Sequence, residues 1–87
     1  MTNTEKEIIK DNLRAYLNNF GYLHIEREEC GDGFYIFTSE QRKLEGSYTQ
    51  FCYNIDYLNG WLYGCVQAAN KVMKLTKKRE EEMYYYV

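Results

Sequence analysis

Apolar residues near the start of the chain recur every three or four positions, which is the spacing of one face of a helix. These apolar positions are Ile9, Leu13, Tyr16, Leu17 and Phe20. Thr4, followed three residues later by Glu7, matches a capping box, in which each side chain accepts a hydrogen bond from a backbone N–H. Gly21 follows as a residue that can adopt the positive φ of a helix end. The pattern predicts a helix that is capped by Thr4 and ends before Gly21.

Two short segments after this helix alternate like strands. In the first, "YLHIEREE", Leu23 and Ile25 share one face. Its other face carries His24, Glu26 and Glu28. The second, "GFYIFTS", is apolar on both faces. The glycines and aspartate of Cys30-Gly31-Asp32-Gly33 between them suit a hairpin turn. We therefore expect an antiparallel hairpin that helices cover on one face, because a lone hairpin is only marginally stable in water.

A second helical pattern follows the polar connection "EQRKLEG". Its apolar positions, at spacings of three and four, are Tyr48, Phe51, Cys52, Ile55, Leu58, Leu62, Cys65, Val66, Ala69, Val72 and Met73. With a capping-box pattern at Ser47–Gln50, they predict one long helix from residue 48 to about residue 79. The alternative is a third strand over residues 47–53 and a helix that begins near Asn54 or Asp56, because Tyr, Thr, Phe and Cys favour strands. Either way, the fold class is α+β in a single domain, residues 1–87: an N-terminal helix, an antiparallel hairpin that a third strand could extend, and a long C-terminal helix.

The long helix also has a second apolar face. Its members are Tyr53, Tyr57, Gly60, Trp61, Gly64, Ala68 and Leu75. Two glycines inside a helix cost about 1 kcal/mol each relative to alanine, which is tolerable if another backbone comes close. The first helix and the hairpin could cover both faces. Alternatively, the Tyr53/Tyr57/Trp61 face is partly open and binds a partner protein or a second copy, because Tyr and Trp are typical of binding hot spots.

The last part of the chain is strongly charged. Lys71, Lys74 and Lys78 share a helical face that could contact phosphates. The net charge of −2 and the neighbouring Glu80–Glu82 disfavour nucleic-acid binding. The same glutamates would oppose the helix dipole, so we expect residues 80–87 to fray.

Composition narrows the class of protein. The chain is tyrosine-rich, with ten Tyr among 87 residues, and this residue suits half-buried positions and interfaces. Cys30, Cys52 and Cys65 are odd in number and show no CxxC spacing, so we expect reduced thiols in a cytoplasmic protein. "MTNTEKEIIK" has no apolar stretch of the kind that a secretion signal requires. The apolar runs are too short to span a bilayer.

No pattern of catalytic or metal-ligating residues emerges. His24 is the only histidine, so a histidine-rich metal site is excluded, and no nucleophile motif accompanies it. A phosphate-binding loop is also missing. We expect no cofactor, no metal and no enzyme activity.

Four acids cluster around the predicted hairpin: Glu26, Glu28, Glu29 and Asp32. They could simply keep a solvated strand edge from pairing with other chains. They could also face a basic surface on a partner, where charge guides orientation and speeds association.

The antiparallel segment Tyr22–Thr38 between helices, and the run Asn59-Gly60-Trp61 on the second helix, carry a resemblance to known proteins. In size and element order the chain resembles small phage- and mobile-element-borne anti-defence proteins, including some anti-CRISPRs. The resemblance implies a non-enzymatic inhibitor that binds a host nuclease or effector complex through acidic and aromatic surfaces. The alternative is a small homodimeric structural or regulatory domain that binds nucleic acid weakly through Lys71, Lys74 and Lys78.

Overall fold

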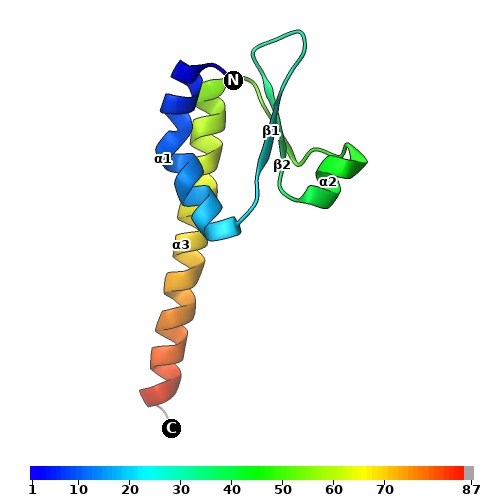
Figure 1. Ribbon diagram of the computed structural model, residues 1–87. Coiled ribbons are helices and arrows are strands. Elements are labelled where there is room, and N and C mark those ends of the chain that lie inside the picture. Colours follow the sequence, from blue (N-terminus) through cyan, green and yellow to red (C-terminus); the bar gives the residue numbers. More distant parts are fainter. Residues whose placement is uncertain (86–87) are drawn as a thin grey trace.

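The computed structural model has an α+β fold with two long helices beside a small antiparallel sheet (Figure 1). It describes the backbone of residues 1–85 and the side chains of residues 1–71. The elements in chain order are α1 (Asn3–Phe20), β1 (His24–Arg27), β2 (Phe34–Phe37), α2 (Glu40–Glu45), β3 (Gln50–Cys52) and α3 (Ile55–Tyr85). The fold class predicted from the sequence is therefore confirmed.

The N-cap of helix α1 lies two residues earlier than predicted. Thr2 is the N-cap, with extended backbone at φ −72° and ψ 163°. The Thr2 hydroxyl accepts from the Glu5 N–H at 3.2 Å, and the Glu5 carboxylate accepts from the Thr2 N–H at 3.0 Å. The prediction of a Thr4/Glu7 cap is wrong, because Thr4 already lies inside the helix. Gly21 ends α1 as predicted, with φ 81° and an N–H that donates to the Leu17 carbonyl.

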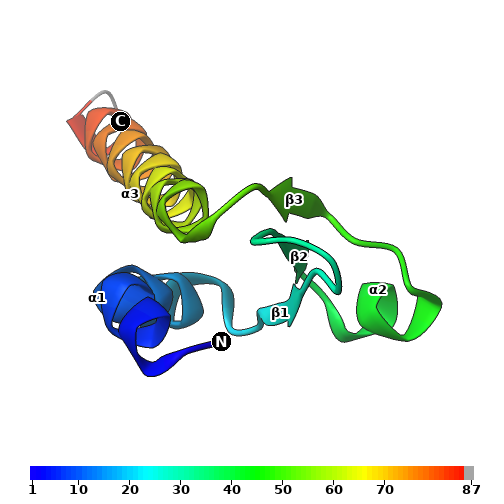
Figure 2. The ribbon, with the colours of Figure 1, turned by 90° about the horizontal axis from the view of Figure 1, so that it is seen from above.

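The three strands form one antiparallel sheet in the order β1-β2-β3. Successive side chains of a strand point to opposite faces. Phe34 and Ile36 of β2 point to the face that the helices cover, as does Cys52 of β3, and all three are fully buried. Seen from above, α1 and α3 lie on one side of the sheet (Figure 2). The sheet and the two long helices thus form two layers.

The prediction of a single helix from residue 48 to about residue 79 is wrong, and the three-strand alternative is correct. Cys52 pairs with Phe34 and Phe51 with Tyr35, so these residues extend the sheet instead of a helix. Asn54 then caps α3: its side-chain oxygen accepts from the Tyr57 N–H at 2.8 Å. The capping box expected at Ser47–Gln50 does not form, because Gln50 already belongs to β3.

The polar connection "EQRKLEG" contains a short helix that the sequence analysis missed. In α2, the hydroxyl of Ser39 caps the first turn by accepting from the Arg42 N–H at 3.2 Å. Gly46 ends the helix at φ 70°. None of the residues of α2 is buried, so it lacks the apolar stripe by which helices are recognised in a sequence.

Helices α1 and α3 run parallel and side by side (Figure 1), and the hydrophobic core lies between them and the sheet. Its buried members are Ile9, Tyr16, Phe34, Ile36, Cys52, Leu58, Leu62 and Val66. In α3, buried residues recur every four positions, as expected for a helix with one face on the core. The Asn12 amide donates to the Asn59 side-chain oxygen at 2.8 Å and so links the two helices where both side chains are partly buried.

Helix α3 continues well beyond the end of α1 (Figure 1). Its backbone is helical to Tyr85, while the fraying predicted for residues 80–87 stays a prediction. Among the residues searched, no helix combines the length and the apolar character that crossing a bilayer requires.

We predict that Leu62→Ala lowers the free energy of unfolding by about 2–5 kcal/mol, because it leaves a cavity between two layers that cannot fully collapse. Leu44→Ala is the matched control: Leu44 of α2 is 81% exposed, so its loss should change stability little. Urea denaturation followed by circular dichroism measures both. Equal effects of the two substitutions would contradict the position of the core.

Candidate interaction surface

Five aromatic rings form a continuous row on the outer side of the sheet, which we call the aromatic surface: Tyr48, Tyr35, Phe51, Tyr53 and Tyr57. The ring centroids of successive members are 5.1 Å, 5.1 Å, 5.7 Å and 5.3 Å apart. Their rings are tilted or edge-to-face, and aromatic pairs at such distances and angles attract beyond simple burial. The row therefore stabilises its own arrangement.

Strand register brings this row together. Tyr35 of β2 lies directly opposite Phe51 of β3, and both are on the face away from the core residues. Tyr48 precedes β3, while Tyr53 and Tyr57 connect the strand to the first turn of α3. Gly33 lies under the Phe51 ring, and a Cβ at this position would collide with that ring. The missing side chain of Gly33 thus leaves the space that the Phe51 ring occupies.

Three tyrosines of the aromatic surface remain open to solvent. The exposed fractions are 51% for Tyr48, 68% for Tyr53 and 44% for Tyr57. Tyr35 and Phe51 are half-buried beneath them. Contiguous exposed rings of this kind are typical of binding surfaces, whereas isolated exposed apolar side chains need no explanation.

Trp61 lies elsewhere, on the side of α3 that faces α1. Its ring centroid is 5.6 Å from that of Tyr16, which in turn is 4.5 Å from Phe20. Trp61 is half-buried against the core. Trp61 was predicted to share one helix face with Tyr53 and Tyr57, but Tyr53 precedes α3 and so is not on the helix at all. Of these three residues, only Tyr53 and Tyr57 belong to the aromatic surface.

The small residues of the predicted second face are exposed. Gly60, Gly64 and Ala68 all lie at the surface of α3. Apart from the neighbouring backbone of α3 itself, a Cβ added at either glycine would meet no atom within 4 Å. No other element of the same copy therefore packs on the glycines, and the strip that they form beside Tyr57 is open.

The hairpin acids border the aromatic surface. Glu26 lies opposite Tyr35 in the strand register, is exposed, and has a carboxylate oxygen 3.1 Å from His24 Nε2. Glu28, Glu29 and Asp32 belong to the loop that ends at Gly33, next to the Phe51 ring. The structure thus brings the acids and Tyr53 and Tyr57 to one end of the sheet.

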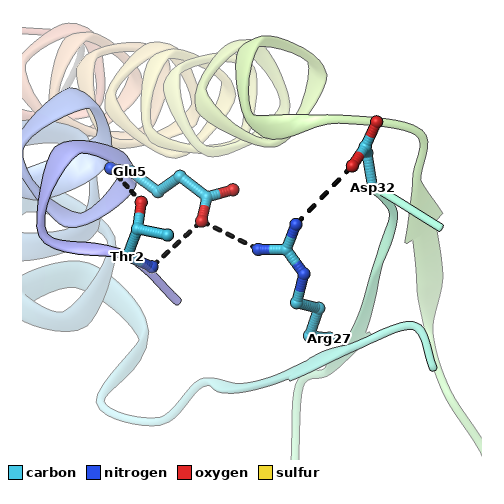
Figure 3. A network of polar contacts seen from close by, with 4 residues as sticks. All are labelled: Thr2, Glu5, Arg27 and Asp32. Atoms are coloured by element: carbon cyan, nitrogen blue, oxygen red, sulfur yellow. Dashed lines mark hydrogen bonds and ion pairs between the residues drawn. The ribbon is translucent and has the colours of Figure 1, made fainter. Parts of the chain in front are cut away.

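An ion-pair network ties the hairpin to the start of α1 (Figure 3). One Arg27 nitrogen, Nη1, lies 2.8 Å from Glu5 Oε1, and Nη2 lies 3.6 Å from Asp32 Oδ1. The Glu5 oxygen that accepts from Arg27 also accepts from the Thr2 backbone N–H. Asp32 is therefore partly neutralised, whereas none of the ion pairs between described side chains involves Glu28 or Glu29.

The thiols of Cys52 and Cys65 lie in surroundings that favour their protonated form. Burial, with a smaller effect of nearby Cys65, raises the pKa of the fully buried Cys52 thiol to about 11. Burial also raises the pKa of Cys65. Thiols with raised pKa values stay protonated and are poor nucleophiles. Cys30 is exposed, and among the residues searched no cluster of His, Cys, Asp and Glu could hold a metal ion.

Only part of the predicted lysine row can be placed. Lys71 is exposed on α3. Lys74 and Lys78 lie outside the residues whose side chains the structure describes. Nucleic-acid binding through the three lysines stays a prediction.

Comparison with known proteins found no match among protein-family models, curated proteins or solved structures. The function must therefore be argued from the surfaces of the chain itself.

We predict that the carboxyl group of Glu5 titrates below its ordinary pKa of 4.5, chiefly because the Thr2 backbone N–H donates to it, with a further contribution from Arg27. Because the folded-state pKa is lowered, this contribution to stability is present above the ordinary value and is lost as the pH falls through the folded-state value. NMR titration of the side-chain carboxyl carbon measures the midpoint. Arg27→Gln should raise the midpoint of Glu5 only part of the way toward 4.5, because the hydrogen bonds from Thr2 remain. A wild-type midpoint at or above 4.5 would contradict the network.

Proposed function

We propose that this protein is a non-enzymatic interaction module that binds a protein partner through the aromatic surface, with the hairpin acids contacting basic side chains of that partner. The observation that carries the proposal is the row of five contacting rings in which Tyr48, Tyr53 and Tyr57 remain largely exposed.

The aromatic surface has the properties of a binding hot spot. Tyrosine offers a large apolar area together with a hydroxyl, and it has few rotatable bonds to immobilise. Each exposed ring is already held by a neighbour, as in the edge-to-face pair of Tyr53 and Tyr57. Binding a partner therefore costs less side-chain entropy than it would for isolated rings, and preorganised surfaces bind more tightly for this reason.

Charge indicates the chemistry of the partner. Glu26, Glu28 and Glu29 border the rings and would attract Lys and Arg side chains. Arginine also stacks on tyrosine faces through cation–π attraction. The same carboxylates would repel phosphates, so a basic protein surface fits this site better than a nucleic acid does.

We further propose that the partner is a host defence nuclease or effector complex, which this chain inhibits. Nucleic-acid-binding sites present Lys and Arg to the phosphate backbone, and an acidic, aromatic surface is complementary to such a site. The size and element order of the chain, which resemble phage anti-defence proteins, support the same proposal.

We predict that Tyr48→Ala combined with Tyr53→Ala weakens partner binding by about 30-fold or more, the effect of losing about 2 kcal/mol at a hot spot. Tyr63→Ala is the matched control, because Tyr63 is 55% exposed on α3 but makes no ring contact with the aromatic surface. The partner is first recovered from the native host with the wild-type chain as bait and then purified. Calorimetry with the purified partner gives the dissociation constants.

Circular dichroism should show all three proteins folded, since the altered side chains are exposed. If the double variant binds the partner as tightly as the wild type, the aromatic surface is not the binding site. Nuclease assays with the same proteins test the inhibitor role separately: the wild type should slow cleavage, and the double variant should not.

A further inference from the structure

A second surface, separate from the aromatic surface, is a groove of about 590 Å³ between α1 and β1. Its apolar lining includes Leu13 and Leu17 of α1 and Ile25 of β1. Leu17 is 39% exposed, so the groove is open to solvent. Its volume is within the range of sites that accept a small ligand or a few side chains.

Three cations line the same groove: Lys6, Lys10 and Arg14. Because they are four residues apart, they form a row along one face of α1. None of them belongs to an ion pair between described side chains, and no acid lines the groove. The groove therefore favours an occupant that combines carboxylates with apolar or aromatic side chains.

The chain itself contains a segment of this composition. Residues 80–87, "EEEMYYYV", join three carboxylates to a methionine, three tyrosines and a valine. Both the charge and the apolar character of this segment complement the groove.

This segment cannot reach the groove of its own copy. The two helices run parallel (Figure 1), and the contact between the rings of Tyr16 and Trp61 fixes their relative level. At about 1.5 Å per residue, α3 extends roughly 36 Å from Trp61 to Tyr85, whereas α1 extends only roughly 6 Å beyond Tyr16. The end of α3 thus lies roughly 30 Å past the end of α1, and only a second copy can bring the segment to the groove.

We propose that the chain forms a two-fold symmetric homodimer in which residues 80–87 of each copy occupy the α1–β1 groove of the other. A two-fold axis makes both contacts equivalent and closes the assembly. With the two copies antiparallel, the projecting end of each α3 enters the groove from the C-terminal end of the other copy's α1 and runs toward its N-terminus. Glu80–Glu82 then face Arg14 and Lys10, and the apolar residues that follow lie farther along the groove, toward Lys6 and Met1.

Reversing charges in the groove and in residues 80–87 tests the proposed dimer directly. The groove variant is Lys10→Glu with Arg14→Glu, and the tail variant is Glu80→Lys with Glu81→Lys. Each alone should raise the dimer dissociation constant about tenfold or more, because attraction becomes repulsion in both grooves. An equimolar mixture of the two variants should dimerise again, since in the mixed pair both grooves meet an opposite charge. Sedimentation equilibrium over a range of protein concentrations at low salt measures all of these.

The control is Arg42→Glu with Lys43→Glu in α2, which changes the net charge as the groove variant does but lies outside the groove. It should dimerise like the wild type. A wild-type chain that stays monomeric at millimolar concentration would overturn the proposal. So would a dimer that both variants leave intact, a mixture that fails to associate, or a control as damaging as the groove variant.

Discussion

Strand β2 carries apolar or aromatic side chains on both of its faces, and the need to cover both faces determines how the rest of the molecule packs. Phe34 and Ile36 are sealed against the helices, whereas Tyr35 points to the opposite side with Phe51. Two helices can cover only one face of a three-stranded sheet, and the short α2 leaves Tyr35 and Phe51 only half-buried. The outer rings therefore pack mainly on one another, which keeps them ordered while leaving Tyr53 exposed.

The sequence predicted correctly those elements whose signal is the spacing of apolar residues along the chain. The apolar period of three to four residues located both long helices, and Gly21 correctly ended the first. The cap was misplaced because Thr2 with Glu5 and Thr4 with Glu7 have the same spacing, and local pattern cannot choose between them. Residues 50–52 have a spacing that fits either helix or strand, and only pairing with β2 decides for the strand.

The sequence predicted only those residues of the candidate site that a local pattern could identify. Tyr53 and Tyr57 were identified because they share a second apolar face when residues 48–79 are taken as one helix, although Tyr53 in fact precedes α3. Tyr48 and Phe51 were wrongly assigned to the core-facing stripe of the long helix, and Tyr35 was not identified at all, because the proximity of these rings arises from cross-strand register that no local pattern specifies. One signal was present: the second strand is apolar on both faces, and a small domain with two helices could cover only one of them.

The central claim is that the inner face of the sheet is sealed while the outer face is open. A water-soluble paramagnetic agent broadens the NMR signals of accessible protons, so it tests this claim most directly. In a dilute, monomeric sample we predict strong broadening of the ring signals of Tyr48 and Tyr53, while those of Phe34 stay sharp. Equal protection of the Tyr53 and Phe34 rings would contradict the claim, because the outer layer would then be covered by the chain itself.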